Sequence, residues 1–221
     1  MCASPYGSVL GGHRAPTRVP TVCKHGPVTI QPPAAFPPST PSIGARASIG
    51  PLRIGPIEVA TPVVLAPMAG VTNASFRRLC RLAGESMLPA ELRPGQAGRL
   101  AIRDGGLMAP AGMYVNEMVT TRALVERNEK TLAMVRSDPG ERVRSIQLYG
   151  VDPSIAGAAV HILVEEDLAD HIDLNFGCPA PKVTRKGGGA ALPWKKDLLA
   201  AILRETVRAC DQAARAAHRE H

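Results

Sequence analysis

The sequence predicts a parallel α/β fold, and three observations lead to this prediction. Four short apolar segments are each followed by a segment with helical periodicity. Polar residues and glycines gather where the predicted strands end, which is where parallel sheets carry their chemistry. Hydrophobic residues make up 45% of the 221 residues, enough to bury a core. The four strand–helix units span residues 63–83, 113–135, 143–166 and 171–210.

The first segment, residues 1–50, is rich in Pro, Gly, Ser and Thr and shows no apolar period, which predicts a disordered extension. No acidic residue occurs before Glu58, so this segment supplies much of the net charge of +7. The overall charge is therefore weak evidence for nucleic-acid binding.

Membrane and metal sites are not expected. No stretch approaches the roughly 18–20 apolar residues that a membrane span requires. The five cysteines are odd in number and lack metal-type spacing. They are typical of reduced thiols in a cytoplasmic protein.

The first unit begins with a short hairpin predicted over residues 52–59, followed by a buried strand at Val63–Ala66. Thr72 or Asn73 is expected to cap the next helix, because both side chains accept hydrogen bonds from backbone amides. The apolar residues of this helix follow a helical spacing: Phe76, Leu79, Cys80 and Leu82.

Residues 85–111 interrupt the alternation of strands and helices. This segment holds three prolines, several glycines and scattered charges. It predicts a long inserted loop, which a compact domain seldom contains.

The second and third units follow the same pattern. Residues 113–118 are predicted as a strand that ends at Asn116 and Glu117, and residues 120–135 as its helix. The third strand covers residues 143–148, and Asp152 or Pro153 opens a helix that runs through Glu166.

The fourth strand starts at His171 and stops near Pro179, which cannot continue a ladder. The domain is predicted to span residues 51–210, and Pro193 is expected in the first turn of its last helix. Residues 211–221 remain Ala-rich and polar and are predicted to form a helical tail.

Cys178 follows the fourth strand directly and is the candidate chemical group. A free cysteine can be a small buried hydrophobe, or here an acid that donates a proton. The basic residues that follow are Lys182, Arg185 and Lys186. They form either a solvated turn or a site for phosphate groups, and the glycines at 187–189 would let that turn bend.

Residues 172–190, reading IDLNFGCPAPKVTRKGGGA, closely resemble the signature of the tRNA-dihydrouridine synthases, flavoenzymes that reduce uridines in tRNA. The run APMAGVTNASFRRLC at residues 66–80 is also similar to that family. The resemblance covers about residues 50–84 and 112–210.

The resemblance implies a (β/α)8 TIM barrel, of which the chain carries only the first four strand–helix units. A barrel truncated in this way leaves strand edges open. We therefore expect the chain to be marginally stable or to self-associate through those edges.

The resemblance also implies FMN as cofactor, NADPH as reductant and tRNA as partner. Cys178 matches the acid that protonates the uracil, and an ordinary thiol carries its proton at neutral pH. The other implied site residues are Pro67, Met68, Ala69 and Gln147 for the flavin, Asn175 for the uracil, and Lys182, Arg185 and Lys186 for tRNA phosphates. The segments with which the family holds the flavin phosphate are not matched, so weak FMN binding and doubtful turnover by this chain alone are expected.

Two alternatives remain. The chain could be another FMN-dependent barrel oxidoreductase acting on a free pyrimidine or an enone, although the basic loop after Cys178 favours RNA. It could also be a non-catalytic RNA-binding remnant.

Overall fold

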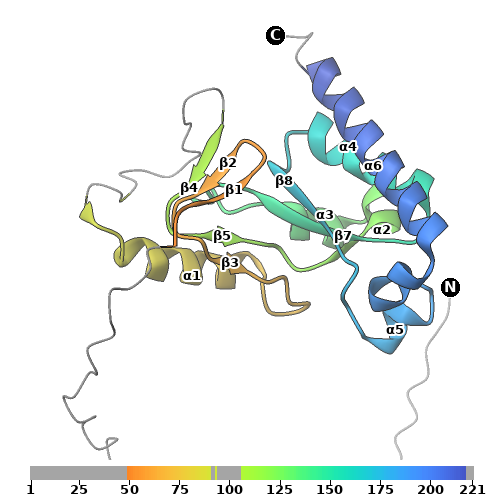
Figure 1. The fold of residues 1–221 in the computed structure, drawn as a ribbon, viewed down its shortest axis with the longest axis horizontal. Coiled ribbons are helices and arrows are strands. Elements are labelled where there is room, and N and C mark those ends of the chain that lie inside the picture. Colours follow the sequence, from red (N-terminus) through yellow and green to blue (C-terminus); the bar gives the residue numbers. More distant parts are fainter. Residues whose placement is uncertain (1–48, 91–92, 94–105, 218–221) are drawn as a thin grey trace, which may run out of the picture. The chain divides into compact units, whose positions relative to one another are not determined.

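The structure is a computed structural model that describes residues 49–90, 93 and 106–217 (Figure 1). The predicted disorder of the N-terminal extension falls almost wholly outside these residues, since residues 1–48 are not described. The remainder belongs to a unit that spans Ala47–His221.

The strands of the four predicted units pair in parallel. β3 (Val64–Leu65) pairs with β5 (Met113–Tyr114), and β7 (Ser145–Tyr149) lies between β6 (Val119–Thr120) and β8 (His171–Leu174). A bridge from Val115 to Ser145 connects the two sheets. The prediction of a mixed α/β fold with parallel strands is confirmed, and the strands within the described ranges do not close into a barrel.

A third sheet contains the predicted hairpin. β1 (Leu52–Ile54) and β2 (Ile57–Val59) are antiparallel, and β4 (Leu107–Ala109) adds to β2 in parallel. The expectation of a loop throughout residues 85–111 is therefore wrong at both ends, because residues 85 and 86 belong to a helix and residues 107–109 form β4. Ala109 is buried in one cluster with Ile57 and Val59, and this burial favours the strand.

α1 (Ala74–Ser86) is capped by Asn73, whose side chain accepts a hydrogen bond from the Phe76 amide. The expected apolar face is wrong in part, because Leu79 and Leu82 are 64% and 49% exposed. Arg77 and Arg81 occupy the buried face instead. They are tolerated there because acidic side chains from other segments neutralise them.

The single helix predicted over residues 120–135 is two helices, α2 (Thr121–Val125) and α3 (Glu129–Val135). Arg127 adopts a left-handed φ of 57°, which ends α2. The Asn128 side chain then accepts a hydrogen bond from the Thr131 amide and starts α3.

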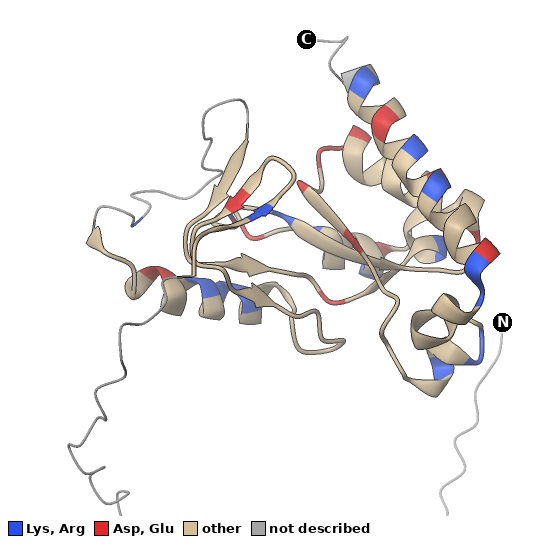
Figure 2. Cartoon of the chain, viewed as in Figure 1, with Lys and Arg blue, Asp and Glu red and all other residues tan. Residues whose placement is uncertain are grey.

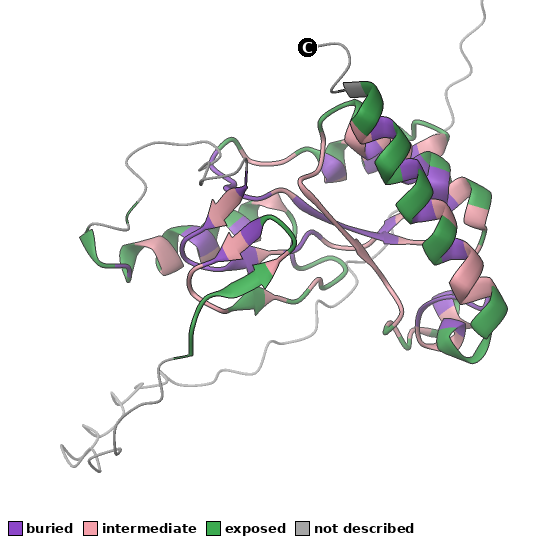
Figure 3. Cartoon of the chain, turned by 45° about the horizontal axis from the view of Figure 1, so that its top comes forward, coloured by how far each residue is buried: buried purple, intermediate pink, exposed green. Residues whose placement is uncertain are grey.

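The main core lies between β7, β8 and the helices that follow them. α4 (Pro153–Glu165) begins at its cap Asp152, as predicted. Figure 3 shows that β7 is buried along most of its length, whereas β8 is only partly buried. The apolar side chains of both strands pack toward α4, so their polar side chains point to the opposite face.

The segment after β8 contains three helical pieces: α5 (Pro181–Thr184), the 3₁₀ helix η3 (Gly189–Trp194) and α6 (Lys196–Ala217). Pro193 therefore lies in η3 and does not open α6. Lys195 has non-helical φ and ψ angles of −105° and 68° and separates the two helices. The predicted helical tail continues α6 without a break as far as Ala217.

α6 packs along α4 (Figure 1). Gly157 of α4 permits the close approach, because a Cβ there would lie 3.3 Å from the Glu205 carbonyl oxygen. No helix in the described part of the chain combines the length and apolar character needed to cross a membrane.

Candidate active site

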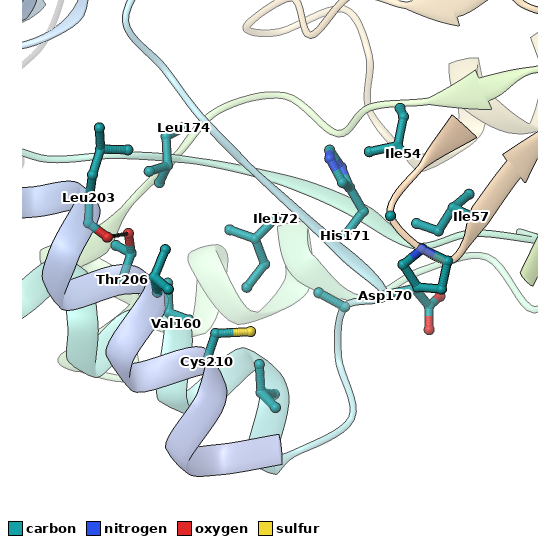
Figure 4. A pocket seen from close by; sticks show the side chains of 15 residues that line it. Ile54, Ile57, Val160, Asp170, His171, Ile172, Leu174, Leu203, Thr206 and Cys210 are labelled. Atoms are coloured by element: carbon teal, nitrogen blue, oxygen red, sulfur yellow. Dashed lines mark hydrogen bonds between the residues drawn. The ribbon is translucent and has the colours of Figure 1, made fainter. Parts of the chain in front are cut away.

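Two cavities flank β8, and only one of them contains strand-end polar groups. The first is an apolar pocket of about 400 Å³ between the β1–β2 hairpin, β8, α4 and α6 (Figure 4). The second is a cleft of about 440 Å³ at the carboxyl ends of β7 and β8. Catalytic groups of parallel α/β proteins gather at such strand ends, so the cleft is the candidate active site.

The cleft brings together five of the predicted site residues, namely Pro67, Ala69, Gln147, Asn175 and Cys178. Met118 and the apolar residues around Cys178 complete its lining. Met68 does not line it and is exposed. Lys182, Arg185 and Lys186 are exposed and lie outside the lining.

Asn175 fixes the backbone that carries Cys178. Its side-chain oxygen accepts hydrogen bonds from the amides of Gly177 and Cys178, at 3.2 Å and 2.9 Å. Its amide nitrogen donates to Gln147 Oε1 at 3.0 Å and to Met118 Sδ at 3.3 Å. Asn175 therefore shapes the loop at the end of β8, a role separate from the uracil contact that the family resemblance implies.

Gln147 is held from two sides. Its side chain is nearly buried, accepts a hydrogen bond from Asn175 and donates one to Asp173 Oδ2. β7 and β8 place Gln147 directly opposite Asp173. The amide of Gln147 is thus fixed in orientation at the floor of the cleft.

His171 lies two residues before Asp173 on β8 and pairs with Ser145 of β7. Its Nδ1 atom is 2.8 Å from the Ser145 hydroxyl oxygen. Burial lowers the pKa of His171 below its ordinary value of 6.5, and the nearby Asp173 carboxylate opposes this shift. The neutral imidazole is therefore favoured in the folded protein.

The opposite wall of the cleft is the turn at residues 67–72. The Thr72 hydroxyl accepts a hydrogen bond from the Met68 amide at 3.0 Å, and the Gly70 amide donates to Glu117 Oε2 at 2.6 Å. Gly70 has a φ of 76°, which favours glycine. Two side chains thus hold the Pro67–Ala69 backbone against the cleft.

A buried arginine supports this turn from below. Arg77 Nε pairs with Glu141 at 2.5 Å, and both side chains are at least 95% buried. Arg77 Nη1 donates to the Thr72 carbonyl oxygen at 2.8 Å and to Asn116 Oδ1 at 3.0 Å. The ion pair therefore connects α1 and the strand end at Asn116 with the wall of the cleft.

The glycine run after Cys178 is buried. Gly189 has a φ of 54°, and a Cβ there would overlap the Cys178 carbonyl oxygen. The Ala190 amide donates to the same oxygen at 3.0 Å. The expectation of a freely bending turn is wrong here, because Gly187, Gly188 and Gly189 permit close packing.

The sequence did not single out Asp173, Met118, Thr72 or Glu117 as site residues. The position of Glu117 at a strand end was a usable signal, whereas the contacts of Asp173 depend on the pairing of β7 with β8. Within the described ranges, no three His, Cys, Asp or Glu side chains are grouped so that they could hold a metal ion.

Comparisons with known proteins point to one family. The family model described as dihydrouridine synthase matches residues 64–219. The chain is 51% identical over 160 residues to a probable tRNA-dihydrouridine synthase of Mycobacterium tuberculosis strain H37Rv, covering 72% of this chain and 36% of that protein. It is 52% identical over 149 residues to the probable tRNA-dihydrouridine synthase of Mycobacterium leprae, covering 67% and 38%.

Similarity extends to tRNA-dihydrouridine synthase B of Pseudomonas aeruginosa, at 37% identity over 160 residues, covering 72% of this chain and 40% of that protein. The chain thus spans less than half the length of each of these three relatives.

Proposed function

The chain belongs to the dihydrouridine synthase family, and from that premise we propose that it contributes to the reduction of uridine to dihydrouridine in tRNA. The observation that carries the proposal is the cleft shared by Cys178, Gln147 and the turn at residues 67–69. A thiol, an oriented amide and the backbone of this turn line one space, and that set of groups supports the proposal. We further propose that the four strand–helix units correspond to part of a (β/α)8 barrel.

The residues of the cleft fit the ring of a flavin, the FMN that the family resemblance implies. Pro67 and Ala69 line one wall of the cleft, and the fixed amide of Gln147 can both donate and accept hydrogen bonds. The lining contains no lysine or arginine, so the cleft itself offers no cation to the phosphate. We expect weak FMN binding to this chain.

Bound there and reduced by NADPH, the flavin would supply a hydride to C6 of the uracil. Cys178 would then give its Sγ proton to C5 and be left as a thiolate, which regains a proton from water. The C5–C6 double bond becomes a single bond, and the hydride and proton are both accounted for. Asn175 holds the Cys178 backbone in place for this transfer.

A non-catalytic RNA-binding role is the second candidate, and one observation favours it. The cations of this region lie on the surface after Cys178, while the cleft itself has none. A chain with that distribution of charge can bind phosphates without holding a flavin tightly.

The test uses the purified chain with an unmodified tRNA transcript, excess FMN and NADPH, followed by mass spectrometry of the digested nucleosides. We expect slow formation of dihydrouridine that depends on added FMN. Binding of tRNA without any dihydrouridine at saturating FMN would favour the second candidate. Absence of tRNA binding would contradict both.

A further inference from the structure

Trp194 is the only tryptophan of the chain, and its side chain lies almost fully in solvent at the end of η3, with 89% of the residue exposed. A single exposed hydrophobic residue is ordinary on a protein surface, but tryptophan combines a large apolar ring with an N–H donor and is enriched where proteins contact other molecules. Its surroundings therefore indicate what it contacts.

Cations flank Trp194 in the sequence, and α5, which together with the turn after it carries three further cations, packs against η3. We define the Trp194 patch as Trp194 with Lys182, Arg185, Lys186, Lys195 and Lys196. All are exposed, and none of the five cations forms an ion pair within the described part of the chain. Figure 2 shows basic residues on α5 and at the start of α6, where Asp197 is the neighbouring carboxylate.

Lys195 lies between the cations of the α5 region and those at the end of η3. Its Nζ atom occupies the space that a side chain at Gly187 would fill. Gly187 has a φ of 83° and follows Lys186 directly, so Lys195 lies across the turn that ends α5. The end of η3 and the end of α5 thus form one continuous basic surface.

The patch is fixed to the proposed proton donor. η3 begins at Gly189, which packs against the Cys178 carbonyl oxygen, and the Ala190 amide donates to that oxygen. Only a few residues of helix separate this contact from Trp194. A molecule held on the patch is therefore positioned relative to the cleft.

The charge decides which kind of molecule fits. Lysine is depleted in the cores of protein–protein interfaces, whereas proteins that bind single-stranded nucleic acid combine cations with aromatic side chains that stack on bases. Resting on the proposed function, we propose that the Trp194 patch docks an unpaired segment of tRNA, with the indole stacked on a nucleobase and the lysines and arginine on its phosphates.

The single tryptophan makes the test direct, because the fluorescence of the chain reports on Trp194 alone. An unmodified tRNA transcript should quench this fluorescence, whereas a fully paired RNA duplex of equal phosphate content should quench it much less. By anisotropy of labelled tRNA, Trp194→Ala should weaken binding about 5- to 150-fold, as expected for the loss of one stacked base. Trp194→Phe should recover part of that loss.

Met87→Ala is the matched control. Met87 is 85% exposed, like Trp194, but it caps the end of α1 and is not part of the Trp194 patch. This variant should bind tRNA like the original chain. Lys195→Ala combined with Lys196→Ala should reduce the salt dependence of tRNA binding.

Three outcomes would count against the inference. Unchanged tRNA affinity in Trp194→Ala overturns it while leaving the proposed function intact if dihydrouridine is still formed. Absence of any tRNA binding overturns the proposed function as well. A blue shift of the fluorescence that grows with protein concentration, without RNA, would show that Trp194 contacts protein.

Discussion

His171 starts β8, contacts Ser145 through its ring and borders the apolar pocket beside β8 (Figure 4). Because burial lowers its pKa, the unfolded chain binds a proton more readily than the folded chain at pH values just below 6.5. The stabilisation of the fold by neutral His171 is therefore fully present above pH 6.5. It is lost as the pH falls below 6.5 toward the lower pKa of the folded protein.

We predict that His171→Gln reduces the acid sensitivity of the fold. The stability of the original chain relative to this variant should decrease between pH about 8 and pH about 5, measured by urea unfolding at each pH. His161→Gln, at a partly exposed position of α4, controls for the loss of a histidine. A difference that stays constant with pH would show that His171 does not titrate in this way.

Arg77 and Arg78 are neighbours in the sequence but differ in burial. Arg77→Ala leaves the buried carboxylate of Glu141 without its partner and should lower the free energy of unfolding by about 3–5 kcal/mol. Arg78 is mostly exposed and lies 3.8 Å from Asp138, so Arg78→Ala should cost at most about 1 kcal/mol. Urea unfolding of both variants measures the difference, and equal losses would contradict the role given to the buried pair.

At the scale of elements, the packing of η3 against the Cys178 loop depends on Gly189. Gly189→Ala should lower the free energy of unfolding by about 1–3 kcal/mol from the left-handed φ alone, with the overlap on the Cys178 carbonyl oxygen adding to the loss. Thermal unfolding measures the effect.

Gly177→Ala is the control in the same segment, since a Cβ at Gly177 meets no atom within 4 Å. It should change stability far less than Gly189→Ala. Similar losses in both variants would mean that the packing of Gly189 does not matter.

The strand–helix units could be predicted because their periodicity reflects local burial, as in β7 and α4. The buried face of α1 could not be predicted in the same way. Its arginines are buried only because Glu141 and Asp138, distant in sequence, lie beside them. The end of α2 was missed because Arg127 takes a left-handed conformation that its residue type does not favour.

The site shows the same division. Gly177, Cys178 and Pro179 marked a strand end in the sequence, and the structure places Cys178 in the cleft with Gln147. The contact from Gln147 to Asp173 required the register of two strands. The burial of Gly189 required the fold of the following helix.

For the whole molecule, β8 is an edge strand that lies beside an apolar pocket. Within the described residues β8 pairs only with β7, and the apolar pocket lies beside it. Open strand edges next to apolar surface favour association between chains.

We predict that the chain self-associates at this edge. Leu203→Glu combined with Val207→Glu, both exposed on α6 and lining the pocket, should shift the sedimentation profile toward monomer. Leu79→Glu, on the exposed face of α1, should leave the association unchanged. A chain that is already monomeric at high concentration, or that responds only to Leu79→Glu, would contradict this account.

The account as a whole depends on Cys178 as the proton donor in the cleft. The most direct measurement compares the rate of dihydrouridine formation in tRNA by the original chain, by Cys178→Ala and by Cys210→Ala, whose cysteine lines the apolar pocket. We predict that Cys178→Ala abolishes the product while tRNA affinity is unchanged, and that Cys210→Ala retains the original rate. Equal rates in the two variants would contradict the central claim.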